Sequence, residues 1–200
     1  MMQDNPIILV CGFGRCGTSL FLQMLAAGGI DVTGRFPSFE APQANALSFD
    51  AGWLAQQRGR AVKLIDPHLQ GIVLPDVPYR IVWLDRDLRQ QARSIIKFVR
   101  LMGGVPVQPG RRAENRLMGS FRRDRPRAIA KLQRAGRPIS IVRFEHLVRA
   151  PAINAVRIAH WLGLDMAAAE AMAAVVRLRT PSCLPGLLEL DLYREREQHG

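Results

Sequence analysis

The residues best suited to chemistry lie in one glycine-rich stretch near the N-terminus, residues 12–17 (GFGRCG), followed by Thr18 and Ser19. The five residues before it, 7–11, form a short apolar run that is typical of a buried strand. After it, apolar residues recur at helical spacing over positions 20–25. Backbone N–H groups of such a loop and of the following helix N-terminus converge on one anion. The sequence therefore predicts a phosphate cradle here.

The same stretch departs from the nucleotide-binding Walker A motif in an informative way. Gly12 and Gly17 have the G-x-x-x-x-G spacing, but Thr18 occupies the position of the motif's lysine. The cation lies instead within the loop, as Arg15. A P-loop kinase or other nucleotidase remains an alternative, as does a glycine-rich turn that binds no ligand.

A second group of polar residues follows another apolar run, 79–84. This run ends in Asp85-Arg86-Asp87, and Ser94 lies eight positions after Arg86. An arginine fork with a hydroxyl suits a phosphate monoester, and ligands of open α/β sheets bind at the carboxyl ends of strands. Taken alone, Arg86 could equally pair with Asp87 or Glu114, and Ser94 could lie on a helix surface.

The elements that must position these residues alternate along the chain. Short apolar runs alternate with amphipathic stretches, which predicts an α/β three-layer sandwich with a mostly parallel central sheet of about four to five strands. We expect one domain over residues 1–200, a helix 43–57 with Leu47, Trp53 and Leu54 facing inward, and a break at Pro126. Strands are expected at 7–11, 61–65, 79–84 and 138–144, and helices at 17–27, 43–57, 87–102, 111–135, 151–162 and 166–178.

Four segments together resemble the sulfotransferase family. Residues 15–19 (RCGTS) are similar to its 5′-phosphosulfate loop, in which arginine or lysine precedes Ser-Gly-Thr-Thr/Ser. Residues 81–94 resemble its 3′-phosphate motif, a strand followed by Arg-Asp and a serine eight residues after the arginine. Residues 142–151 look like its Arg-Tyr-Glu-Asp-Leu segment with the following proline, and 161–164 like its Phe-Leu-Gly-Leu. The four segments occur in the family's order.

This resemblance implies a P-loop nucleotide-hydrolase-like fold and a cosubstrate, 3′-phosphoadenosine 5′-phosphosulfate (PAPS), used without a metal ion. It implies sulfuryl transfer to a hydroxyl or amine of a small-molecule or saccharide acceptor. Arg86 and Ser94 would bind the 3′-phosphate of PAPS. The 5′-phosphosulfate would be bound by Gly14, Arg15, Cys16, Gly17, Thr18 and Ser19.

Lys63 is the best further candidate for a catalytic cation. It lies inside an apolar strand, which is costly unless the ammonium reaches an anion, and it resembles the family lysine that precedes the 3′-phosphate motif. Cytosolic relatives place their catalytic histidine two residues later, where this chain has Ile65. Other relatives use a glutamate in the loop after the first helix, and Glu40 occupies a comparable place. The resemblance therefore favours Glu40 as the base, with His68 and Asp66 as alternatives.

One further family segment has no counterpart. Many relatives close the nucleotide site with a late Arg-Lys-Gly segment, and nothing after Pro151 matches it. Arg122, Arg123 or Arg179 could substitute for it. An inactive sulfotransferase-like nucleotide-binding protein therefore remains an alternative.

The net charge of +11 comes almost entirely from arginine, because Lys63, Lys97 and Lys131 are the only lysines. Aromatic residues do not alternate with the arginines, and no helix-turn-helix pattern is present, so a small polyanion is favoured over nucleic acid. The sequence does not predict an oligomeric state.

Cellular location is also constrained. No apolar run approaches the roughly 18–20 residues that span a bilayer, and the N-terminus lacks a signal-peptide pattern. Cys11, Cys16 and Cys183 are odd in number and lack metal-ligand spacing. We expect a soluble cytoplasmic protein, in which Cys16, at a helix N-terminus, has a lowered pKa and is reactive.

Overall fold

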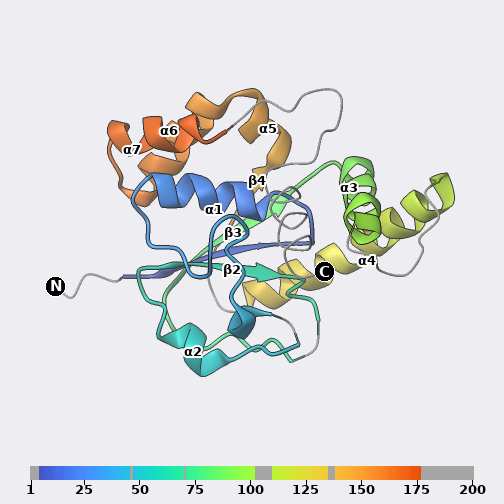
Figure 1. Cartoon of the computed structure of the whole chain (residues 1–200). Coiled ribbons are helices and arrows are strands. Elements are labelled where there is room, and N and C mark those ends of the chain that lie inside the picture. Colours follow the sequence, from blue (N-terminus) through green and yellow to red (C-terminus); the bar gives the residue numbers. More distant parts are fainter. Residues whose placement is uncertain (1–4, 46, 70, 102–109, 135–137, 177–200) are drawn as a thin grey trace, which may run out of the picture.

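A computed structural model of the chain contains a central sheet of four parallel strands in the order β2-β1-β3-β4 (Figure 1). The strands are β1 (Ile7–Gly12), β2 (Ala61–Ile65), β3 (Tyr79–Asp85) and β4 (Ile139–Arg143). The structure describes residues 5–45, 47–69, 71–101, 110–134 and 138–176.

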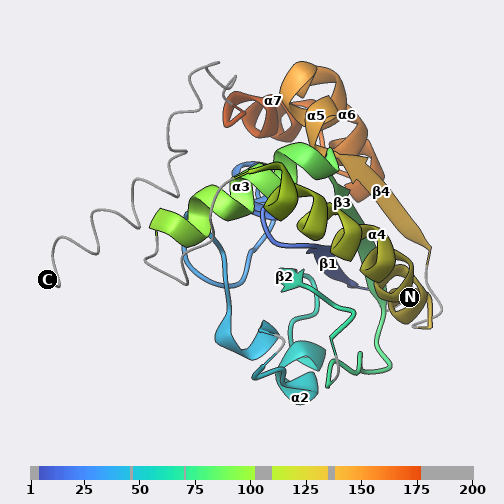
Figure 2. The same ribbon diagram turned by 90° about the vertical axis from the view of Figure 1, so that its right-hand side faces the viewer.

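Helices cover both faces of this sheet (Figures 1 and 2). One face packs against α1, α6 and α7, and the other against α2, α3 and α4. The predicted α/β three-layer class is therefore confirmed. The helices are α1 (Thr18–Ala27), α2 (Ala51–Ala55), α3 (Leu88–Leu101), α4 (Arg111–Gln133), α5 (Phe144–Arg149), α6 (Pro151–Leu162) and α7 (Met166–Ala174), with a 3₁₀ turn η1 (Pro42–Ala44).

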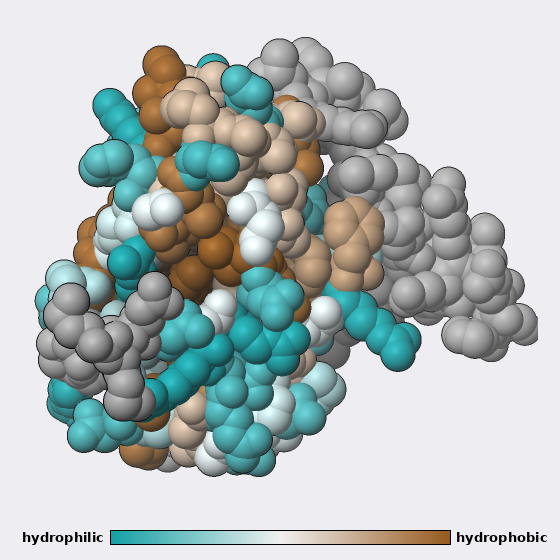
Figure 3. Space-filling view, turned by 90° about the vertical axis from the view of Figure 1, so that its left-hand side faces the viewer, coloured by the Kyte–Doolittle hydropathy of each residue, from teal (hydrophilic) through white to brown (hydrophobic). Residues whose placement is uncertain are grey.

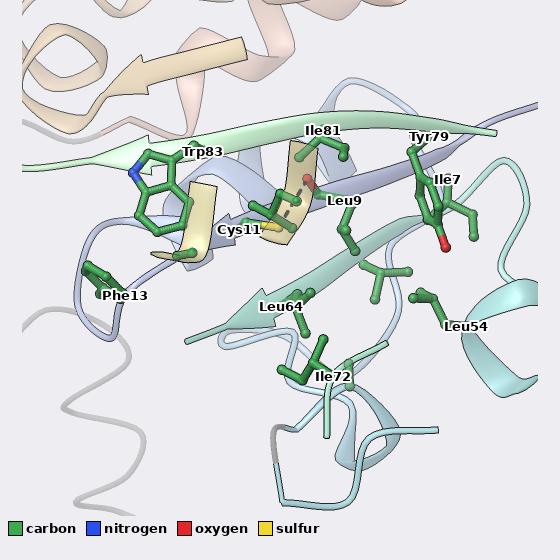
Figure 4. Packing of buried hydrophobic residues seen from close by; sticks show 14 of the residues in the cluster. Ile7, Leu9, Cys11, Phe13, Leu54, Leu64, Ile72, Tyr79, Ile81 and Trp83 are labelled. Atoms are coloured by element: carbon green, nitrogen blue, oxygen red, sulfur yellow. Dashed lines mark hydrogen bonds between the residues drawn. The ribbon is translucent and has the colours of Figure 1, made fainter. Parts of the chain in front are cut away.

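The central strand β1 is buried along its whole length, which explains its continuous apolar sequence. Successive side chains of a strand point to opposite faces. Ile7, Leu9 and Cys11 enter the core on the α2–α4 side, where Figure 4 shows them beside Ile81 and Trp83 of β3. Ile8 and Val10 of the same strand enter the core on the α1 side.

The parallel arrangement gathers the candidate residues at one edge of the sheet. Gly12 is paired with Ile65, and Cys11 with Trp83, so β1, β2 and β3 end nearly level. The glycine loop therefore begins beside the residues that follow β2 and β3. This edge is where ligands bind in open α/β folds.

The predicted helix 43–57 is wrong over much of its length. In the described part of this range, only η1 and the short α2 are helical, and Leu47, expected inside, is 96% exposed. Side-chain hydrogen bonds favour a turn instead: Asn45 Oδ1 accepts from the Leu47 N–H, and Ser48 Oγ donates to the Pro42 carbonyl. Leu54 is buried as predicted.

The predicted break at Pro126 is also wrong, because α4 runs through it. Proline removes one backbone donor, but Phe121, Ala128 and Leu132 hold the helix against the core on either side of it. The fourth strand is shorter than predicted, since Phe144 begins α5. The last predicted helix, 166–178, ends at Ala174, and its final two positions lie outside the described residues.

The surface is unevenly apolar. On the face drawn in Figure 3, apolar residues gather over the layer of α1, α6 and α7, and the lower part is mostly hydrophilic. None of the helices in the described ranges combines the length and apolar character that a membrane span requires.

Substitution of Gly17 tests the backbone conformation of the glycine loop. The Gly17 φ of 108° is strained for any other residue, and an added Cβ would overlap the Phe144 ring, whereas a Cβ on Gly14 would meet nothing within 4 Å. Gly17→Ala should lower the free energy of unfolding by about 1–3 kcal/mol in urea denaturation. Gly14→Ala is the matched control, and equal effects of the two changes would contradict this description of the loop.

Candidate functional site

Lys63 is the centre of the site. Val62 and Leu64 of β2 enter the core on the α2–α4 side, so the intervening Lys63 points to the α1 side. Its side chain is buried, and Nζ donates to Ser19 Oγ at 3.0 Å, the Ser38 carbonyl at 3.0 Å and Glu40 Oε1 at 2.9 Å. An ammonium has three protons, and each has an acceptor here. Three predicted site residues, Lys63, Ser19 and Glu40, thus meet in one cluster.

Glu40 connects this cluster to open space. Its side chain is 68% exposed although Lys63, its ion-pair partner, is buried. A cavity of about 510 Å³ lies beside it, lined among others by Arg35, Ser38, Trp53 and Glu40 itself. A small molecule in that cavity could bring a hydroxyl to the Glu40 carboxylate.

The glycine loop has the geometry of a turn built around a helix N-terminus. Arg15 has a φ of 63° and Gly17 a φ of 108°, and the Cys16 N–H donates to the Phe13 carbonyl at 3.2 Å. Helix α1 begins at Thr18 with no side-chain cap and no acidic residue in its first turn. The partial positive charge of this helix end is therefore not offset by the chain's own carboxylates there.

Arg15, Arg86 and Ser94 join the two predicted motifs into one site. Arg15 Nε donates to Ser94 Oγ at 3.2 Å, and Arg86 Nη1 donates to the Arg15 carbonyl at 2.9 Å. Arg86 is 6% exposed, and its guanidinium lies 4.4 Å from the centre of the Phe144 ring. Two guanidinium groups held this close together favour a ligand with several negative charges.

His68 and Asp66, the other candidate bases, lie apart from this cluster. The His68 ring packs edge-on against Phe13 at 5.3 Å, and its buried Nδ1 has no hydrogen-bond partner. Burial raises the pKa of Asp66, although His68 and a hydrogen bond from the Gly14 backbone oppose the rise. Among the described residues, neither candidate forms a hydrogen bond or ion pair with Lys63.

Cys16 contradicts the prediction of a reactive thiol. Its side chain is buried, and this burial raises the pKa to about 12. Hydrogen bonds from Thr18 and the charge of Lys63 lower the pKa, but burial outweighs them. Because thiolates are the reactive form, Cys16 serves to pack the loop rather than to react.

Two residues of the site were not predicted. Gln91 is buried, and its Nε2 donates to the Gly14 carbonyl at 2.8 Å, which fixes the loop against α3. Phe144 lies under Arg86. Sequence spacing could have identified Gln91. It lies three residues before Ser94, so the two side chains are on the same face of α3. Within the described ranges, no group of three or more His, Cys, Asp or Glu could hold a metal ion.

Cysteine labelling tests the buried state of Cys16. In a Cys183→Ser background at pH 8, iodoacetamide should modify neither Cys11 nor Cys16 in the folded protein, because burial raises the pKa of both thiols. Both should react after denaturation in urea, as measured by mass spectrometry. Rapid modification of Cys16 in the folded protein would refute the assignment.

Comparison with known proteins supports the fold. No model of a known protein family matches the chain, and no curated protein sequence does. Among solved structures, the chain is similar to a retinol dehydratase in complex with androsterone and inactive cofactor PAP, with a TM-score of 0.54 and 16% identity. The match covers 86% of this chain but 64% of the dehydratase. This chain thus shares the fold of that protein over most of its own length.

Proposed function

We propose that this protein transfers a sulfuryl group from PAPS to a hydroxyl or amine of a small-molecule or saccharide acceptor. The main support is the buried Lys63, whose ammonium contacts both Ser19, at the start of α1, and Glu40, beside an open cavity. The structure that shares the fold was solved with PAP, the nucleotide that PAPS becomes when it loses its sulfuryl group, and with the small molecule androsterone.

The residues present fit this cosubstrate. Residues 14–19 would hold the 5′-phosphosulfate, since the loop and the uncapped end of α1 present backbone N–H groups beside the Arg15 side chain. Arg86 and Ser94 would bind the 3′-phosphate, because both already contact Arg15 within this loop. Because these hydrogen bonds place the two motifs next to each other, a single ligand with two anionic groups could contact both.

PAPS supplies the sulfuryl group and a phosphate leaving group. Each of the three Nζ–H groups of Lys63 already donates to an acceptor in the structure. To donate to the ligand, Lys63 must therefore give up one of these three hydrogen bonds. Glu40 is the acceptor best placed to move, because its side chain is mostly exposed. Its movement would free one Nζ–H for the leaving oxygen and also free the carboxylate to accept a proton.

The proposed transfer forms one bond to sulfur, breaks another and moves one proton. A bond forms between the acceptor oxygen or nitrogen and sulfur, the bond from sulfur to the phosphate oxygen breaks, and the acceptor proton passes to Glu40. The electron pair of the broken bond stays on the phosphate, whose charge Lys63 and Arg15 stabilise. No step requires a metal ion.

Turnover with PAPS tests this assignment. Release of PAP from PAPS should be stimulated by at least one member of a panel of phenols, sterols and saccharides, measured by liquid chromatography. Glu40→Gln should lower that stimulated rate by about 10²–10⁴-fold at saturating PAPS, because the amide cannot accept the proton. His68→Ala is the control and should retain most of the rate.

Two results would contradict the proposal. If His68→Ala loses the rate and Glu40→Gln keeps it, the base is wrongly assigned. If the protein turns over ATP with Mg²⁺ but never PAPS, the proposed reaction itself is wrong.

A further inference from the structure

A cavity of about 630 Å³ lies where β3 and β4 end, next to α4 and α5. In Figure 2, α4 crosses in front of β3, and β4 lies uncovered beside it. Positive side chains dominate the lining, which is unusual because like charges repel one another. The arginines that line the cavity are Arg86, Arg122, Arg125, Arg143 and Arg149.

The carboxylates of the cavity are already engaged. Asp85 Oδ2 pairs with Arg125 at 3.1 Å. Glu145 Oε1 accepts from the Asp87 N–H at 3.0 Å, and Asp87 Oδ1 accepts from the Gln90 N–H at 2.9 Å. The acidic residues therefore neutralise Arg125 and fix the start of α3, and within the described ranges they form no ion pair with Arg122, Arg143 or Arg149.

Three arginines from three different elements remain available. Arg122 comes from α4, Arg143 from the end of β4 and Arg149 from α5, and all three are exposed. Among the described residues, no hydrogen bond or ion pair is formed by the side chains of these three arginines. Guanidinium groups converging on one cavity are typical of a phosphate-binding site.

Arg86 links this cavity to the glycine loop. It is a buried arginine of the lining, and its Nη1 donates to the Arg15 carbonyl. A ligand whose first anionic group lies on the loop can therefore place a second one in the cavity without leaving the protein surface. The cavity volume is ample for a phosphate and part of a nucleoside.

We propose that Arg122 and Arg149, with Arg143, bind the 3′-phosphate of PAPS from the side opposite Arg86. This inference rests on the proposed function. It assigns specificity for a nucleotide with a 3′-phosphate to helices α4 and α5, and it uses Arg122, one of the arginines that could replace the missing Arg-Lys-Gly segment.

Isothermal titration calorimetry with two nucleotides tests the inference. Adenosine 3′,5′-bisphosphate carries the group in question, and adenosine 5′-phosphate lacks it. Arg122→Ala and Arg149→Ala should each raise the Kd for the bisphosphate by about tenfold, as expected for one charged hydrogen bond. The Kd for the 5′-phosphate should change less than about twofold. Arg116→Ala is the matched control, since Arg116 is exposed on α4 but does not line the cavity.

Each outcome has a separate meaning. If the unaltered protein binds neither nucleotide, the proposed function fails, and this inference fails with it. If it binds the bisphosphate and the Arg122 and Arg149 variants behave like Arg116→Ala, only this inference is overturned. Equal losses of affinity for the two nucleotides would also overturn the inference, because the arginines would then not distinguish a nucleotide with a 3′-phosphate from one without it.

Discussion

The arrangement of the site depends on the cost of burying one charge. Lys63 lies inside the sheet, where an ammonium without partners would destabilise the fold by several kcal/mol. Its acceptors come from separate parts of the chain: Ser19 from the first turn of α1, and Ser38 and Glu40 from the loop before η1. These contacts with Lys63 hold that loop against the N-terminal end of α1.

The parallel sheet concentrates further positive charge at the same edge. β1 leads into Arg15 and β3 into Arg86, and the hydrogen bond between them joins the two segments. Aromatic rings support both guanidinium groups, Phe98 near Arg15 and Phe144 near Arg86. A ligand with several negative charges would stabilise such an edge, which is consistent with the bisphosphate nucleotide that we propose.

Local patterns in the sequence predicted the strands, the glycine loop and the α/β class, because buried strands and phosphate loops have short-range signatures. They failed at residues 43–57, where the hydrogen bonds of Asn45 and Ser48 outweigh helical periodicity. The pKa of Cys16 was predicted with the wrong sign because burial depends on packing between distant segments. The pairing of Lys63 with Glu40 likewise depends on the path of a loop, and no spacing rule specifies that path. The sequence named both residues as separate catalytic candidates and did not predict that they pair.

In the mechanism that we propose, Lys63 exchanges Glu40 for the 5′-phosphate group of the nucleotide. A crystal structure with adenosine 3′,5′-bisphosphate measures this directly. The account predicts that the 5′-phosphate lies on residues 14–19 within hydrogen-bonding distance of Lys63 Nζ, and that the contact of 2.9 Å between Nζ and Glu40 is broken. A bound nucleotide that leaves Lys63 with its three present partners, or whose phosphate lies away from this loop, would contradict it.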